Sequence, residues 1–333
     1  MWTGTLLLGL LGFLLSVVFQ LVERRVLGWY HGLRAASLSR LGSPPGRLSR
    51  CRAAAVNLVK GRSMHAFLAV SGLQKVYEGS GRRVEAVRDL TFTVEAGELV
   101  CLVGPSGCGK TTLLKCVGGL LTPTAGEVRL AGRPVSGPPP GMAFVFQEYG
   151  QSLFPWMRVR DNVELPLKQN PLSKTRRQEL VADALESVGL TDAAKAYPWQ
   201  LSGGMQQRVA IARALAYEPE VLLMYEPFAA VDTQTRADLE DLVRGLWRRR
   251  GFTILFVTHD IDEAVYLGER VLILSASPTV VQEQLKVDLP DERDQLHTRV
   301  APRFAELRTH VYEQVQAAKR GTPVTKSDTP PPR

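Results

Sequence analysis

Cysteine is scarce in this chain of 333 residues. The four cysteines are Cys51, Cys101, Cys108 and Cys116, and no two of them form a Cys-x-x-Cys pair. The absence of such a pair excludes the common cysteine-based zinc and thiol–disulfide motifs. Isolated cysteines of this kind favour a reduced, cytosolic setting.

Most of the chain also carries no net charge. The formal charge of +8 comes from residues 1–63, which hold nine of the 41 Lys and Arg residues but only one of the 33 acidic residues. The rest of the chain has 32 residues of each sign. A balanced domain lacks the basic surface that nucleic-acid binding needs, so we expect no nucleic-acid partner.

Charged residues are absent altogether from residues 2–22, a run rich in Leu, Val and Phe that precedes Glu23, Arg24 and Arg25. About 20 apolar residues span a bilayer as a helix, and a basic flank tends to stay inside. A signal peptide is disfavoured because no basic segment precedes the run and no small-residue cleavage site follows it. The run predicts one transmembrane helix, with everything after it in the cytoplasm.

A complete phosphate-loop motif follows the short apolar run LVCLV at residues 99–103. A buried parallel strand leading through a glycine-rich loop into a helix is the arrangement that binds nucleotide phosphates. In such a loop, Lys110 neutralises the outer phosphates and the Thr111 hydroxyl binds Mg²⁺. The candidate ATP-binding residues here are Gly104, Pro105, Ser106, Gly107, Cys108, Gly109, Lys110, Thr111 and Thr112.

Two later apolar runs, at residues 221–224 and 252–257, also predict buried strands. The first ends in Tyr225-Glu226-Pro227, where Glu226 is placed to act as the general base for an attacking water. The second ends in Thr258-His259-Asp260, where His259 can contact the terminal phosphate. The alternatives are that Glu226 is a solvated acid at a strand end and that His259 has a structural role. The surrounding motifs favour the catalytic roles.

A second glycine-rich motif, LSGGMQQ, occupies residues 201–207 and leads into a predicted helix. A phosphate loop alone indicates nucleotide binding. The second anion site suggests that two subunits close on each other's ATP. Its candidate nucleotide contacts are Ser202, Gly203, Gly204 and Gln206.

Taken in order, the motifs of residues 64–319 resemble the ATP-binding subunits of bacterial ATP-binding cassette (ABC) importers, most closely the nitrate, sulfonate and taurine branch. They are Tyr77, the phosphate loop, Gln147 in FVFQEYGQSLFPW, the signature LSGGMQQRVAIARAL, Tyr225-Glu226-Pro227, the turn that ends in Asp232, and His259. The resemblance implies that Tyr77 stacks on adenine and that Asp232 lies at the nucleotide site. It also implies that Gln147 joins Thr111 in Mg²⁺ coordination and takes part in catalysis.

The resemblance further implies an α/β phosphate-loop NTPase fold with an antiparallel β edge and an α-helical subdomain. A head-to-tail dimer is expected, in which Ser202, Gly203 and Gly204 of one subunit contact ATP held by Lys110 of the other. The expected partners are a second ATPase subunit, a transmembrane permease and, through the complex, a periplasmic binding protein. The expected location is the cytoplasmic face of the bacterial inner membrane.

Residues 6–34 resemble the last membrane helix and cytoplasmic tail of an importer permease. Two origins fit this segment, a true fusion and a gene model that joins two neighbouring genes. The predicted organisation is a membrane helix and permease-like tail (1–34), a linker (35–63), the ATPase domain (64–287, with its helical subdomain at about 149–199), a C-terminal helical extension (288–319) and a disordered tail (320–333).

Tyr225 departs from the family pattern, which has Asp before the catalytic Glu. That Asp holds Mg²⁺ through water, whereas a tyrosine hydroxyl, with an ordinary pKa near 10, is neutral at pH 7. We therefore expect ATP binding to survive and hydrolysis to be weakened, which leaves an ATP-clamping regulatory subunit as the alternative function. A sequence error is the other explanation, because Asp and Tyr codons can differ by one base.

Two further ABC classes are disfavoured. Soluble ABC ATPases that act on DNA or ribosomes typically carry two nucleotide domains, long coiled coils or zinc-binding cysteines, and exporters carry a full set of membrane helices before the ATPase. None of these features occurs in the sequence.

Overall fold

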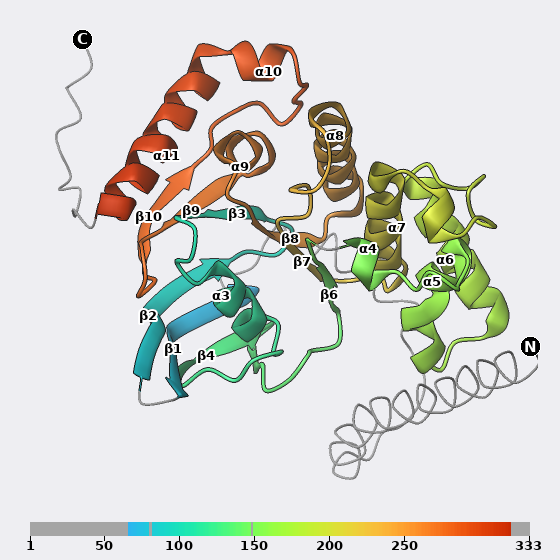
Figure 1. Ribbon diagram of the computed structural model, residues 1–333, viewed down its shortest axis with the longest axis horizontal. Coiled ribbons are helices and arrows are strands. Elements are labelled where there is room, and N and C mark those ends of the chain that lie inside the picture. The colour runs from blue at the N-terminus through green and yellow to red at the C-terminus, as the bar shows by residue number, and fades with distance from the viewer. Residues whose placement is uncertain (1–65, 80–81, 148, 321–333) are drawn as a thin grey trace, which may run out of the picture. The chain divides into compact units, whose positions relative to one another are not determined.

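The computed structural model describes residues 66–79, 82–147 and 149–320 (Figure 1). These residues belong to one compact unit. Across these three ranges, no helix has both the length and the apolar character needed to cross a bilayer. The predicted membrane span at 2–22, the permease-like segment, the linker and residues 321–333 of the predicted tail lie outside the described residues, whereas Arg320 is the last residue of the C-terminal helix.

The larger sheet has six strands in the order β10-β9-β3-β8-β7-β6. All neighbours are parallel except β10 and β9. The three apolar runs predicted as buried strands correspond to β3, β7 and β8, each within one residue of the expected ends. The strands are β3 (Leu99–Val103), β6 (Met142–Val145), β7 (Val221–Tyr225), β8 (Thr253–Val257), β9 (Arg270–Leu274) and β10 (Val281–Lys286).

Both faces of this sheet are buried, which explains why its strands read as continuous apolar runs. In β3, Leu99 and Cys101 face one hydrophobic core, and Val100 and Leu102 face the other. The same alternation continues in β7 and β8. A shift of one residue in strand register would turn each side chain toward the opposite core. Burial of both faces therefore fixes the register and, with it, the positions of the strand ends.

A smaller antiparallel sheet has the order β2-β1-β4-β5. It consists of β1 (Leu68–Gly79), β2 (Arg82–Val94), β4 (Ala125–Leu130) and β5 (Arg133–Pro134). Helix α3 (Lys110–Val117) contacts both β2 and β7 and so lies between the two sheets (Figure 1). The predicted antiparallel addition to an α/β core is therefore present.

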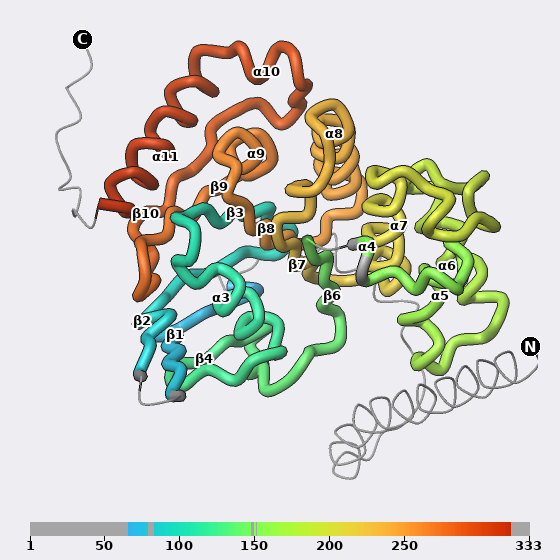
Figure 2. Tube along the Cα trace, viewed as in Figure 1, coloured from blue at the N-terminus to red at the C-terminus, as the bar shows by residue number. Residues whose placement is uncertain are grey.

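Between β6 and β7 the chain is helical (Figure 2). Helices α5, α6 and α7 pack on one another, and α7 also contacts β6 and α8. The helix predicted from spacing at 174–188 is α6, which buries Leu180, Ala184 and Leu185. The elements are α4 (Tyr149–Ser152), α5 (Val159–Glu164), the 3-10 helix η2 (Leu165–Gln169), α6 (Lys174–Ser187), the 3-10 helix η3 (Pro198–Gln200) and α7 (Gly203–Ala216).

The C-terminal extension packs on the large sheet. Helix α11 contacts α9 and β9 and lies beside them in Figure 1. Its apolar stripe of Phe304, Leu307, Val311 and Val315 is buried in the core. The remaining helices are α8 (Thr233–Arg250), α9 (Ile261–Leu267), α10 (His297–Val300) and α11 (Pro302–Arg320).

One buried amide organises the loop that enters α5. Asn162 is fully buried, and its Oδ1 accepts a hydrogen bond from the Phe154 backbone N–H at 2.8 Å. Its Nδ2 donates to the carbonyl oxygens of Phe154, Met157 and Arg158 at 3.0–3.2 Å. A single side chain thus joins backbone groups of three residues of this loop, two of whose carbonyl oxygens also accept backbone N–H groups.

We expect Asn162→Ala to lower the free energy of unfolding by about 1–3 kcal/mol, because buried backbone groups would lose their partner. Urea denaturation of the full-length protein measures this difference. Asn170→Ala, whose altered side chain lies outside the network, is the control and should have a much smaller effect. Equal midpoints for the two variants would contradict the proposed role of Asn162.

Candidate functional site

The predicted phosphate loop joins β3 to α3. Gly109 has a φ of 111°, and a Cβ there would lie 2.9 Å from the Ala86 carbonyl oxygen, so only glycine fits. Lys110 is 5% exposed, and its ammonium donates to the carbonyl oxygens of Gly104 and Pro105 at 2.8 and 3.0 Å. The loop therefore holds a positive charge in place for a phosphate.

The predicted adenine-stacking residue lies next to this loop. Tyr77, on β1, has 43% of its surface exposed. Its Oη lies 3.2 Å from Oγ1 of Thr112 in the first turn of α3. An exposed aromatic ring is thus brought beside the phosphate loop from a strand of the other sheet, which suits stacking on a base.

The other predicted catalytic residues follow the carboxyl ends of neighbouring parallel strands. Gln147 comes two residues after β6, Glu226 comes directly after β7, and His259 comes two residues after β8. Strand β7 lies between β6 and β8, and β8 pairs with β3, which leads into the phosphate loop. The fold therefore brings these side chains and Lys110 to the same edge of the sheet.

The candidate base is held by two contacts. His259 Nδ1 lies 3.2 Å from Glu226 Oε2, and the Glu226 side chain is 14% exposed while that of His259 is 57% exposed. The Glu226 backbone has a φ of 42°, and its N–H donates to the Val257 carbonyl oxygen at 2.7 Å. The half-exposed imidazole thus borders the more buried carboxylate, whose backbone is fixed to the next strand.

Thr111, one of the two residues predicted to bind Mg²⁺, is hydrogen-bonded to Tyr225. Thr111 Oγ1 donates a hydrogen bond to Tyr225 Oη at 2.5 Å, where the family pattern expects a carboxylate. Burial raises the pKa of the Tyr225 phenol above its ordinary value, so the phenol carries no charge at neutral pH. No group of three or more His, Cys, Asp or Glu side chains suited to a metal occurs in the described part of the chain. The structure thus gives Thr111 a neutral partner, and the assignment of Thr111 and Gln147 to Mg²⁺ stays a prediction.

The signature residues lie on a helix of the helical segment. Ser202 is the N-cap of α7, and its hydroxyl accepts the Met205 backbone N–H at 3.3 Å. Gly203 and Gly204 form the first turn, and a Cβ at Gly204 would lie 2.3 Å from Thr235 Cγ2. The glycine therefore allows close packing of α7 on the start of α8.

Two residues predicted to contact nucleotide have structural partners within this chain. Gln206 Nε2 donates to the carbonyl oxygens of Pro198 and Leu201 at 3.0 and 3.2 Å, which fastens the loop before α7. Asp232 is the N-cap of α8, and its Oδ1 accepts the Thr235 backbone N–H at 3.0 Å. Hydrogen bonds from that backbone lower the pKa of Asp232, which keeps the cap ionised.

Comparisons with known proteins agree with this fold. A sequence model described as "ABC transporter" matches residues 87–229. The chain is 45% identical over 227 residues to a nitrate import ATP-binding protein of Synechocystis sp., which covers 68% of this chain and 85% of that one. It is 41% identical over 254 residues to an aliphatic sulfonates import ATP-binding protein of Bacillus licheniformis, covering 76% and 95% of the two chains.

The chain belongs to the ABC transporter ATP-binding family. It is accordingly an ATPase of the ABC type. Its fold matches a dimeric bacterial ABC transporter cassette with a TM-score of 0.59 and 33% identity, over 67% of this chain and all of that one. It matches equally well, at 32% identity, a dimeric post-hydrolysis cassette bound to ADP and phosphate.

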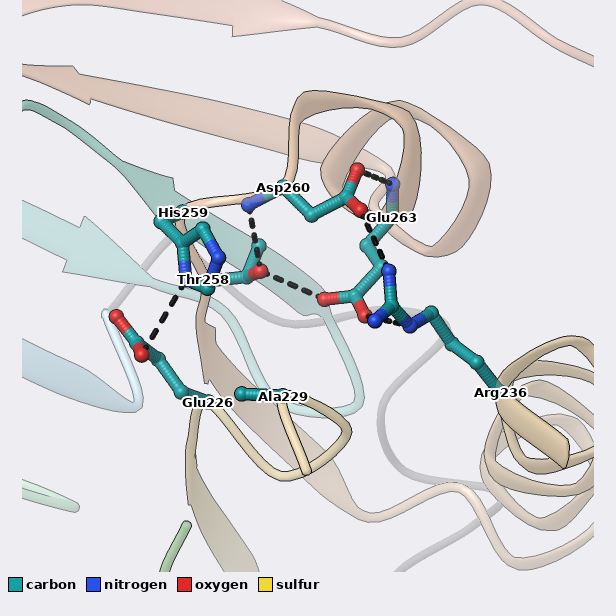
Figure 3. Close-up of a pocket in the computed structure, with 7 residues that line it drawn as sticks. All are labelled: Glu226, Ala229, Arg236, Thr258, His259, Asp260 and Glu263. Carbon is teal, nitrogen blue, oxygen red and sulfur yellow. Dashed lines mark hydrogen bonds and ion pairs between the residues drawn. The ribbon is translucent and has the colours of Figure 1, made fainter. Parts of the chain in front are cut away.

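A small pocket lined in part by Glu226 and His259 holds a hydrogen-bond network that sequence reasoning missed (Figure 3). Thr258 Oγ1 donates to Glu263 Oε2 at 2.6 Å and accepts the Asp260 backbone N–H at 2.9 Å. Arg236 of α8 donates to Asp260 Oδ2 at 3.0 Å. These bonds hold the turn that carries His259 against α8 and α9.

A sequence signal for this network exists. Asp260 is the N-cap of α9 and accepts the backbone N–H groups of Asp262 and Glu263. An acid three residues after an N-cap is typical of a capping box. In the structure, Glu263 instead points to Thr258, which the local pattern alone does not reveal.

Burial raises the pKa of Glu263 to about 8, and the nearby Asp260 and Glu240 carboxylates act in the same direction. The hydrogen bond from Thr258 and the charge of Arg236, whose Nε lies 3.7 Å from Oε1, oppose the rise but do not cancel it. A buried carboxyl group that lines the same pocket as His259 thus stays largely protonated at neutral pH.

This pKa makes stability depend on pH. Between about pH 4.5 and pH 8 the folded state keeps a proton that the unfolded carboxyl has released, so stability falls as pH rises through that interval. We compare the free energies of unfolding of Glu263→Gln and the wild type. The value for the variant minus the value for the wild type should increase by roughly 1–3 kcal/mol between pH 5.5 and pH 8.5, since one pKa unit corresponds to about 1.4 kcal/mol. Chemical denaturation across this pH range measures the difference, with the exposed Glu292→Gln as the control. Curves for Glu263→Gln and wild type that stay parallel would contradict the raised pKa.

Proposed function

We propose that this chain is the ATP-hydrolysing, energy-coupling subunit of an ABC importer for nitrate, a sulfonate, taurine or a related small solute. The observation that carries this function is the arrangement of Lys110, Glu226 and His259 at one edge of the sheet. Import ATP-binding relatives for nitrate and sulfonates, at 45% and 41% identity, support the importer class and the range of solutes.

The proposed chemistry uses residues already in position. Backbone N–H groups of the phosphate loop and the Lys110 ammonium hold the ATP phosphates. Glu226 accepts a proton from the attacking water as general base. His259, which contacts Glu226 at 3.2 Å, is exposed enough to turn toward a terminal phosphate.

An aromatic surface on the helical segment supports a permease partner. We define this surface by Phe154, Trp156, Tyr197 and Trp199. Trp156 and Trp199 are 61% and 69% exposed, and their rings pair with Phe154 and Tyr197 at centroid distances of 5.2 and 5.9 Å. Large exposed aromatic side chains are typical of protein-binding surfaces.

The rest of the proposed assembly follows from the importer class. A permease would supply the translocation pathway, and a periplasmic binding protein would deliver the solute through the complex. The subunit would then lie at the cytoplasmic face of the inner membrane, where a helix at residues 2–22 could anchor it.

A second candidate function is an ATP-clamping subunit that hydrolyses slowly. The hydrogen bond from Thr111 to the neutral Tyr225, in place of a contact to a carboxylate, favours this alternative. The metal's contribution to phosphoryl transfer is electrostatic, so its loss lowers turnover more than affinity.

Steady-state hydrolysis of MgATP by the full-length protein distinguishes the two functions. We expect Glu226→Gln to lose about 10²-fold or more of the wild-type rate, because the general base is removed. The clamping function predicts that Tyr225→Asp raises turnover at least tenfold by restoring an anion, whereas the hydrolysing function predicts similar rates for Tyr225→Asp and the wild type. Equal rates for the wild type and Tyr225→Asp would rule out the clamping function, and an unaffected Glu226→Gln would contradict the assignment of the base.

ATP should join two copies of the chain through Ser202. Glu226→Gln preserves the ATP-bound state, so light scattering after size exclusion should show this variant as a dimer with ATP and a monomer without it. Adding Ser202→Arg should prevent the dimer, because a long cationic side chain would replace the small hydroxyl group facing the partner's nucleotide. Ser173→Arg alters the N-cap of α6 in the same way and is the matched control. Dimers that survive Ser202→Arg would contradict the proposed interface.

A further inference from the structure

The contact between Tyr225 and Thr111 joins two rigid elements. Tyr225 is the last residue of β7 and pairs with Val257 of β8. Thr111 lies in the first turn of α3, directly after Lys110. The phenol oxygen is therefore fixed beside the phosphate loop by backbone geometry.

The direction of this hydrogen bond leaves the Tyr225 hydroxyl with a free donor. Thr111 Oγ1 donates to Tyr225 Oη at 2.5 Å, so the hydrogen of the phenol is available to another acceptor. Among the residues that the structure describes, none accepts it. The Tyr225 side chain is half-buried. Leaving its hydroxyl hydrogen without an acceptor would therefore be unfavourable once a nucleotide covers the site.

The surrounding charge favours an anion as that acceptor. The Lys110 ammonium is held in the adjacent loop, and the N-terminal end of α3 adds the positive end of the helix dipole. A carboxylate at position 225 would repel phosphate oxygens unless a cation lay between them. A neutral phenol removes that repulsion and contributes a hydrogen-bond donor.

We propose that Tyr225 is a direct ligand of the terminal phosphate and that it uncouples nucleotide binding from magnesium. The proposal rests on the function proposed above and defines how its site recognises ATP. Metal-free ATP then binds nearly as tightly as the magnesium complex, because the tyrosine hydroxyl and Lys110 hold the phosphate that a metal would otherwise bridge to the protein.

The test is the ATP dissociation constant of the full-length protein, measured by isothermal titration calorimetry with excess MgCl₂ and again with excess EDTA. For the wild type we expect the two constants to agree within about threefold. For Tyr225→Asp we expect binding in EDTA to weaken by roughly 30-fold or more relative to MgCl₂. For Tyr225→Phe, which keeps the ring but loses the donor, we expect ATP binding in EDTA to be about tenfold weaker than for the wild type, the size of one hydrogen bond to a charged group.

ADP distinguishes a phosphate contact from a general effect on the fold. Tyr225→Phe should leave ADP affinity within about twofold, because ADP lacks the terminal phosphate. A wild-type protein that depends on magnesium as strongly as Tyr225→Asp, or a Tyr225→Phe protein that binds metal-free ATP as well as the wild type, would overturn the proposal. Both of those results leave the proposed function standing, whereas a wild-type protein that binds ATP under neither condition would overturn the proposed function itself.

Discussion

The parallel pairing of β3, β8 and β7 is the constraint on which the rest of the site depends. Neighbouring strands lie about 4.8 Å apart, so residues that follow them are brought to the same region of the molecule. Lys110, Glu226 and His259 reach one edge from widely separated parts of the chain in this way. Burial of both sheet faces fixes the strand register and therefore the position of each side chain.

Much of this frame could be predicted from the sequence, because it is encoded in short apolar runs. A strand buried on both faces needs consecutive apolar residues, and the runs before Gly104, Glu226 and His259 have them. The family and its ATPase class followed from motifs whose chemistry requires particular residues, such as Lys110 in a glycine-rich loop. The site roles proposed for these residues, including the base and the phosphate-sensing histidine, stay predictions.

The features that the sequence did not predict depend on the direction in which side chains point in the folded chain. Glu263 has the sequence position of a capping residue, yet it faces Thr258 because the α9 turn closes against α8. Gln206 and Asp232 are predicted to contact nucleotide, and their partners in this chain are neighbouring backbone groups. The sequence shows that Tyr225 departs from the family pattern. Its hydrogen bond to Thr111, which leaves the phenol hydrogen free to donate, is visible only in the structure.

The positive φ of Glu226 has a consequence for how this protein could be altered. A non-glycine residue at that angle costs of the order of 1 kcal/mol, and glycine or asparagine would relieve most of it. Selection or design for thermal stability alone would therefore favour removing the carboxylate. The residue proposed as the general base is the one that a stability criterion, applied without knowledge of the site, would discard first.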